Sequence, residues 1–127
     1  MNEEQSQSRY AVTKDGVIKD TQTGLEWYVG PDKDTNWYEA NAWVNGLKVA
    51  GGGWRLPSRD ELKGLYQQGV GDRNMDPGFK TSGCWVWSGK VKNVSSAWGF
   101  FFYFGSEPWY DRSYADRFRV FAVRSLL

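Results

Sequence analysis

The stretch Gly53-Trp54-Arg55-Leu56-Pro57-Ser58-Arg59-Asp60-Glu61-Leu62 decides most of what the sequence predicts about the fold. Pro57 keeps the entering chain extended. Ser58 and Glu61 form the Ser-x-x-Glu pattern of a capping box, in which each side chain accepts a hydrogen bond from the backbone of the other residue. The stretch therefore predicts an extended entry and a helix that begins after Ser58. Its first apolar stripe consists of Leu62, Leu65 and Tyr66.

Three further signals lie in the first half of the chain. Lys14-Asp15-Gly16 separates residues 10–13 from residues 17–19, which predicts a hairpin. Residues 25–28 follow a second turn and predict a strand. Asn36 and Glu39 can form another capping box, which predicts a helix that we expect to end at Gly51-Gly52-Gly53.

The second half predicts strands joined by long loops. Residues 97–104 and 118–123 are apolar on both alternating faces, which is typical of central strands covered on each side. Residues 83–88 precede them, after an irregular stretch at residues 69–82. The expected fold class is α+β, with one mostly antiparallel sheet, two helices and long loops.

Composition and length bound the organisation of the chain. A length of 127 residues suits one domain, and 8 Trp, 7 Tyr and 7 Phe can fill its core without many aliphatic residues. We expect a disordered polar tail at residues 1–9 and a single domain at residues 10–127. The tail has no apolar run, so we expect neither a signal peptide nor membrane insertion there.

Charge and residue usage exclude several classes of function. A formal net charge of +1 does not predict a nucleic-acid binder. The chain has no histidine and one cysteine, which excludes an intramolecular disulfide, a Ser-His-Asp triad, a Cys-His dyad and a typical zinc site. We therefore expect no enzyme, no cofactor and no metal. Cys84 is expected to be a buried small hydrophobe.

Four motifs, in order along the chain, carry a family resemblance. They are residues 20–27, Trp54-Arg55-Leu56-Pro57 with the following Glu61-Leu62, Trp85-Val86-Trp87-Ser88, and residues 118–124. Together they resemble the Lcl C-terminal domain family, which occurs in bacterial collagen-like adhesins. The Arg-Leu-Pro helix start and the last strand also resemble the formylglycine-generating-enzyme branch of the C-type-lectin-like fold. This resemblance implies a C-type-lectin-like domain with ligand loops near its last strands.

The loop at residues 106–117 is the best candidate for a binding surface, because it mixes aromatic rings with charges. Rings can stack on the apolar side of a sugar, and arginine can bind carboxylate or sulfate groups with paired donors. The alternative is that the rings pack beneath the loop and the charges pair with each other. The expected ligand-binding residues are Trp109, Tyr110, Arg112, Tyr114 and Arg117.

Other conspicuous residues have structural explanations. Trp54 is expected to fill the core, and Arg55 to pair with a carboxylate or cap carbonyl groups. Trp85, Trp87 and Trp98 are also expected to be core residues, although alternation places Trp85 and Trp87 on one face of a strand, where they extend the ligand surface if that face is open. Residues 32–36 and 72–76 carry alternating oxygen side chains that suggest calcium. Neither completes an EF-hand loop, so solvated turns are the default interpretation.

Three functions follow in order of preference. The first is a non-catalytic module that binds acidic or sulfated glycans, as the adhesin resemblance implies. The second is a protein-binding display module, whose partner is a cell-surface protein. The third is an enzyme similar to the formylglycine-forming oxidases, which use paired thiols with copper, whereas this chain has one thiol. The resemblance implies a secreted or cell-surface location, with the cytoplasm and a homo-oligomer left open.

Overall fold

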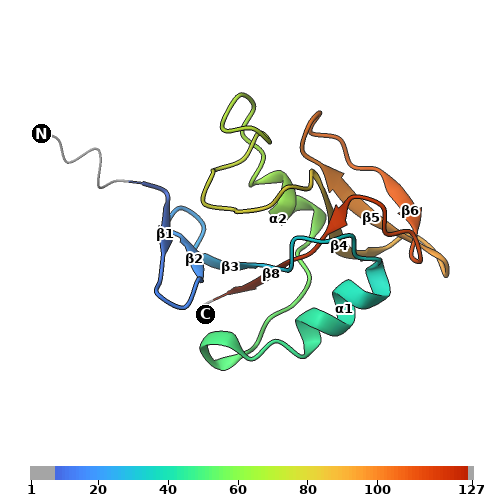
Figure 1. Cartoon of the computed structure of the whole chain (residues 1–127), viewed down its shortest axis with the longest axis horizontal. Helices are drawn as coiled ribbons and strands as arrows, with labels where there is room; N and C mark the ends of the chain where they lie inside the picture. Colours follow the sequence, from blue (N-terminus) through green and yellow to red (C-terminus); the bar gives the residue numbers. More distant parts are fainter. Residues whose placement is uncertain (1–7, 126–127) are drawn as a thin grey trace, which may run out of the picture.

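The computed structural model describes residues 8–125, and within them the chain folds into two four-stranded sheets with two α-helices (Figure 1). The α+β class expected from the sequence is confirmed. The expectation of one sheet is wrong. Residues 1–7 of the expected tail lie outside the described residues, and Arg9 forms an ion pair with Asp20 at 2.7 Å.

The first sheet has the order β1-β2-β3-β8 and is antiparallel throughout. The predicted hairpin is confirmed, since Tyr10 pairs with Asp20 across a turn in which Gly16 adopts a φ of 88°. A positive φ is accessible to glycine without steric cost. The strands are β1 (Tyr10–Val12), β2 (Ile18–Asp20), β3 (Leu25–Val29) and β8 (Phe121–Ser125).

The second sheet has the order β6-β5-β4-β7, and β7 runs parallel to β4 while the other pairs are antiparallel. β5 therefore occupies the central position that its apolar faces predicted. It ends at Phe101, because the chain turns there and the backbone N–H of Gly105 donates to the Phe101 carbonyl at 2.8 Å. The strands are β4 (Trp85–Val91), β5 (Ser96–Phe101), β6 (Trp109–Asp111) and β7 (Phe118–Arg119).

The last apolar segment passes from one sheet to the other. The sequence predicts a single strand at residues 118–123, but β7 pairs with β4 in the second sheet and β8 pairs with β3 in the first. Val120 lies between them and is buried. Apart from Arg119, residues 118–123 are apolar because each part is buried in its own sheet, so the pattern alone cannot reveal the change of partner.

Both helices begin at the predicted capping boxes. α1 (Trp37–Asn45) starts after Asn36, whose side chain accepts a hydrogen bond from the Glu39 backbone. α2 (Arg59–Lys63) starts after Ser58 in the same way. α1 ends before the predicted glycine run, because the N–H of Gly46 already caps the helix carbonyls. A short 3-10 turn, η2 (Val49–Gly51), follows, and the run Gly51 to Gly53 turns the chain back with positive φ angles.

Trp54 and Arg55 have the structural roles expected of them. Trp54 is buried, and its indole N–H donates to the Val49 carbonyl at 2.9 Å. Arg55 forms a bidentate ion pair with Glu61. The Glu61 carboxylate also accepts a hydrogen bond from the backbone N–H of Ser58, as part of the capping box. The Arg55 backbone additionally bridges to Val123 of β8. The extended segment before α2 is therefore bound to β8 of the first sheet, and the first turn of α2 is bound to that segment through Arg55 and Glu61.

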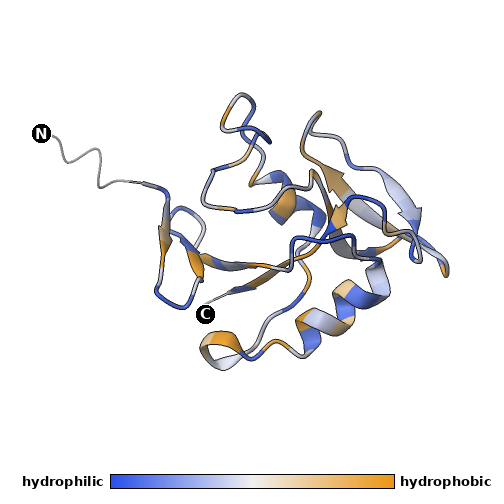
Figure 2. Ribbon diagram, viewed as in Figure 1, coloured by the Kyte–Doolittle hydropathy of each residue, from blue (hydrophilic) through white to orange (hydrophobic). Residues whose placement is uncertain are grey.

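Aromatic side chains dominate the interior, as the composition predicts. Trp27, Phe79 and Phe121 form mutual ring contacts in one cluster. Trp87 stacks on Phe118 at 3.9 Å in a second cluster, beneath α1. In Figure 2 much of β5 is coloured hydrophobic, whereas β6 is pale. Within residues 8–125, no helix has the length and apolar character needed to cross a membrane.

Candidate functional site

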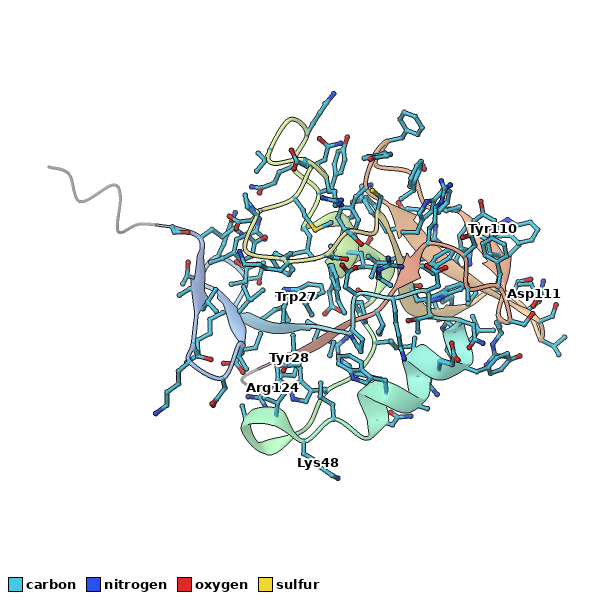
Figure 3. The ribbon with its side chains drawn as sticks, viewed as in Figure 1. Trp27, Tyr28, Lys48, Tyr110, Asp111 and Arg124 are labelled. Carbon is cyan, nitrogen blue, oxygen red and sulfur yellow. The ribbon has the colours of Figure 1, made fainter. Side chains whose placement is uncertain are left out.

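The loop at residues 106–117 contains β6, the edge strand of the second sheet. Figure 3 shows Tyr110 and Asp111 of this strand at the end of the molecule opposite β1, far from Lys48 and Arg124. Successive side chains of a strand point to opposite faces of the sheet. The five predicted ligand-binding residues are consequently divided among three places.

One face of β6 carries an aromatic groove. Tyr110 and Tyr114 are stacked with ring centroids 4.9 Å apart and planes at 12°, and Trp85 meets Tyr110 edge-on at 5.5 Å. These rings line a shallow hollow of about 80 Å³ with Asp116 and Arg117. Enclosed small-molecule pockets typically have volumes of about 300–1,000 Å³. The groove therefore suits a ligand that lies along the surface. We call these five residues the Tyr110 groove.

Arg117 is the free cation of the Tyr110 groove. Its side chain is exposed, and no carboxylate in residues 8–125 pairs with it. Its φ is 66°, a left-handed conformation that costs a non-glycine residue on the order of 1–3 kcal/mol. The carboxylate of Asp34 accepts the Arg117 backbone N–H at 3.1 Å and helps hold this conformation. Strain of this kind is typical of positions that present a side chain for binding.

The aromatic surface continues beyond the Tyr110 groove. Trp85 stacks on Phe101 with centroids 3.8 Å apart, and Phe101 contacts Tyr103 and Phe104 at 5.7 and 5.3 Å. Tyr103 and Phe104 are 54% and 78% exposed. A row of rings thus runs from the exposed turn after β5 to Tyr114. Arg117 gives this row a charged end.

Arg112 lies elsewhere, against α1. Its guanidinium sits 4.1 Å from the ring centre of Trp37 and 4.7 Å from that of Tyr38, and it donates to the Val94 carbonyl at 3.1 Å. Its backbone carbonyl also accepts the N–H of Trp37, the first residue of α1. These contacts join α1 to the second sheet. Cation–π contacts of this geometry are stabilising, and Arg112 is not among the residues that line the Tyr110 groove.

Trp109 points to the opposite face of the sheet from Tyr110. It pairs in register with Trp98 of β5, and the ammonium of Lys92 lies 4.9 Å from the Trp109 ring centre. The ring is 50% exposed. Of the five predicted residues, the structure therefore brings together Tyr110, Tyr114 and Arg117, and places Trp109 and Arg112 apart.

Trp85 belongs to the Tyr110 groove although it was not among the predicted ligand-binding residues. Alternation put Trp85 and Trp87 on one face, and both indeed contact Phe118. Trp87 is fully buried, whereas Trp85 is partly exposed at the end of the strand. The alternation of side chains along the strand was the sequence signal that could have identified Trp85 as a groove residue. The degree of exposure depends on where the loop folds back, which the pattern does not encode.

The two oxygen-rich segments are engaged within the protein. Arg119 donates to Asp32 at 2.7 Å and to Asp34 at 3.0 Å. The hydrogen bond from Arg119 is the largest of the contacts that lower the pKa of Asp32 to about 2. Asn74 accepts the Gly69 N–H and donates to two backbone carbonyls. Residues 8–125 contain no group of three or more His, Cys, Asp or Glu side chains that could hold a metal ion.

Two other features lie outside the predicted site, namely Cys84 and a hollow against the first sheet. Cys84 is buried, as expected of a small hydrophobe. A hollow of about 540 Å³ lies against the first sheet, between Val12, Val29 and Lys80. It contains none of the predicted ligand-binding residues.

The comparisons with known proteins agree with the motifs. No curated protein matches the chain. The family model described as the Lcl C-terminal domain matches residues 16–124, which is most of the chain and includes β2 to β8 with both helices. The protein therefore belongs to the Lcl C-terminal domain family.

Proposed function

We propose that this domain is a non-catalytic module that binds acidic or sulfated carbohydrate in the Tyr110 groove. The observation that carries the proposal is the juxtaposition of an unpaired, exposed Arg117 with the stacked pair Tyr110 and Tyr114. Rings offer flat apolar faces for a sugar, and a guanidinium offers paired donors for a carboxylate or sulfate group. Both requirements of an acidic sugar are present in one hollow.

The contrast with the other arginines supports this assignment. Arg119 is held by two carboxylates, and Arg55 and Arg124 each pair with a glutamate. An arginine that already donates to a protein carboxylate has fewer donors for a ligand. Asp116, at the rim of the Tyr110 groove, supplies an acceptor for sugar hydroxyl groups. Membership of the Lcl C-terminal domain family is consistent with a role in adhesion. We therefore propose a secreted or cell-surface location for this protein.

A glycan array followed by a salt titration tests this function. We expect selective retention of sulfated or carboxylated glycans over their neutral analogues. Affinity for the retained glycan should fall as ionic strength rises, because the exposed charge of Arg117 is screened. Retention of neutral glycans alone, with no dependence on salt, would contradict the proposal.

One observation favours a second function, the display of a protein-binding surface. Tyr103 and Phe104 are exposed next to Phe101, so the row of rings extends beyond what one sugar unit covers. Rigid aromatic residues supply contact area at low entropic cost in protein interfaces. Phe104→Ala should then reduce binding to a cell-surface protein with little dependence on salt. An oxidase remains the third proposal, and turnover that requires both copper and Cys84 would support it.

A further inference from the structure

The face of the second sheet opposite the Tyr110 groove carries its own combination of rings and cations. Trp98 and Trp109 lie side by side on β5 and β6. The Lys92 ammonium sits 5.4 Å from the Trp98 ring centre and 4.9 Å from that of Trp109. The Arg59 guanidinium also lies over Trp98, 3.8 Å from its ring centre. We call Trp98, Trp109, Lys92, Lys90 and Arg59 the Trp109 face.

The cations on this face differ in how they are held. Arg59 donates to Glu107 at 2.9 Å, so its charge is compensated within the protein. Lys90 and Lys92 are exposed, and no carboxylate within residues 8–125 pairs with either. The Lys92 ammonium therefore stands beside the half-exposed indole of Trp109, and Lys90 lies next to Arg59.

A hollow adjoins these groups. It has a volume of about 340 Å³ and is lined by Ser58, Arg59, Asp60, Lys90 and Glu107, so cationic and acidic side chains both border it. Since Arg59 both lines the hollow and covers Trp98, the hollow and the rings form one continuous surface. This volume is about the lower end of the range for small-ligand sites. The surface is larger than the Tyr110 groove and opens on the other side of the sheet.

We propose that the Trp109 face is a second binding surface, which takes an acidic sugar independently of the Tyr110 groove. The Trp109 ring would stack on the sugar, and Lys92 and Lys90 would pair with its carboxylate or sulfate groups. Lys92 and Trp109 lie on the side of the sheet opposite to Arg117 and Tyr114. One domain thus holds two acidic chains, one on each side of the sheet.

A stoichiometry measurement tests the second surface. A heparin-derived tetrasaccharide is titrated into the full chain by calorimetry at low salt. Indole N–H signals are followed by nuclear magnetic resonance, with Trp109 and Trp98 assigned through Trp→Phe variants. We expect two tetrasaccharides per domain and a shift of the Trp109 signal. Lys92→Gln should weaken one of the two sites at least tenfold, as the loss of a charge-assisted hydrogen bond predicts. Lys48→Gln, which removes an exposed charge elsewhere, should change neither site.

The outcomes separate this inference from the proposed function. One tetrasaccharide per domain, lost in Arg117→Ala and unaffected by Lys92→Gln, would overturn the second surface and leave the Tyr110 groove. One tetrasaccharide lost in Lys92→Gln and unaffected by Arg117→Ala would support the Trp109 face and refute the proposed function. If no tetrasaccharide binds, both are refuted. Lys92→Gln lies on the surface, so its folding does not limit the test.

Discussion

Three arginines near the end of the chain show how position decides the role of one residue type. Arg119 is drawn into an ion-pair cluster with Asp32 and Asp34. Arg112 is sandwiched against rings of α1. Arg117 lies between them in sequence but is exposed and unpaired with any carboxylate in the described chain. Of the three, Arg117 is the one whose side chain is exposed to a ligand.

The first prediction concerns Arg117. Arg117→Ala should weaken binding of an acidic tetrasaccharide to the Tyr110 groove by about 1.5–3 kcal/mol, because a charge-assisted hydrogen bond is lost. The free energy of unfolding should not fall, since the substitution removes no ion pair. Calorimetry and thermal unfolding measure the two quantities. Arg117→Lys, which keeps the charge but loses the forked donors, should give an intermediate affinity. Wild-type affinity in Arg117→Ala would place the site elsewhere.

The second prediction concerns the pH dependence that Asp32 contributes. Its pKa is about 2 in the folded protein and 3.8 without the fold, so the folded state favours the ionised form. The stabilisation is present above about pH 4 and is lost as the pH falls toward 2. The free energy of unfolding, measured by denaturant titration from pH 6 to pH 2, should decline less steeply in Asp32→Asn than in the wild type. Asp116→Asn, which breaks no ion pair, should follow the wild type. Parallel curves for all three proteins would refute the role of Asp32.

At the scale of the elements, the helices depend on their caps. α2 has only five residues, and isolated helices of that length are not stable in water. Its position is fixed by the reciprocal bonds of Ser58 and Glu61, and by Leu62 in the core. Arg55 reinforces Glu61, and the pKa of Glu61 is lowered chiefly by this hydrogen bond. The stretch from Arg55 to Leu62 thus combines connected polar contacts of Arg55, Ser58 and Glu61 with the buried side chain of Leu62.

The third prediction follows from these caps. Ser58→Ala and Asn36→Ala should each lower the free energy of unfolding by about 1 kcal/mol, the usual cost of a lost N-cap. Chemical denaturation measures the change, with Ser106→Ala as a control whose exposed hydroxyl caps no helix. Equal stability of Ser58→Ala and Ser106→Ala would mean that the capping bond contributes nothing measurable. The helix starts were predictable from sequence because a cap is a local pattern.

At the scale of the whole molecule, two hydrophobic clusters join the sheets, and each cluster contains residues from both of them. Phe118 packs under Trp87 in the second sheet, and three residues later Phe121 packs against Trp27 in the first. Gly99 permits the close approach of Phe118, because a Cβ there would lie 2.8 Å from its ring. The short passage through Val120 joins the two sheets. The loop before this passage, which contains Tyr110 and Asp111, lies at the end of the molecule opposite β1.

The fourth prediction compares a buried and a half-exposed tryptophan. Trp87→Ala should lower the free energy of unfolding by about 3–5 kcal/mol, since Trp87 is fully buried and stacked on Phe118. Trp109→Ala should cost far less, because half of that ring remains in contact with water. Thermal and chemical unfolding of the two variants give the comparison. Similar losses in both would show that the Trp109 face is part of the core.

The sequence by itself determined the local features: both capping boxes, the first hairpin, the α+β class, the structural roles of Trp54 and Arg55, and the family. The caps, the hairpin and the pair of Arg55 with Glu61 depend on residues close together in the chain, and the family depends on short motifs that are recognised without knowledge of any long-range contact. Only the tertiary structure decided that there are two sheets, that residues 118–123 are shared between them, and that Trp109 and Tyr110 face opposite sides. Strand pairing is a contact between distant segments, so an apolar pattern shows that a strand is covered but not by what. For the same reason the sequence could not distinguish the role of Arg117 from that of Arg112. Whether an arginine has a partner depends on which residues the folded chain brings near it.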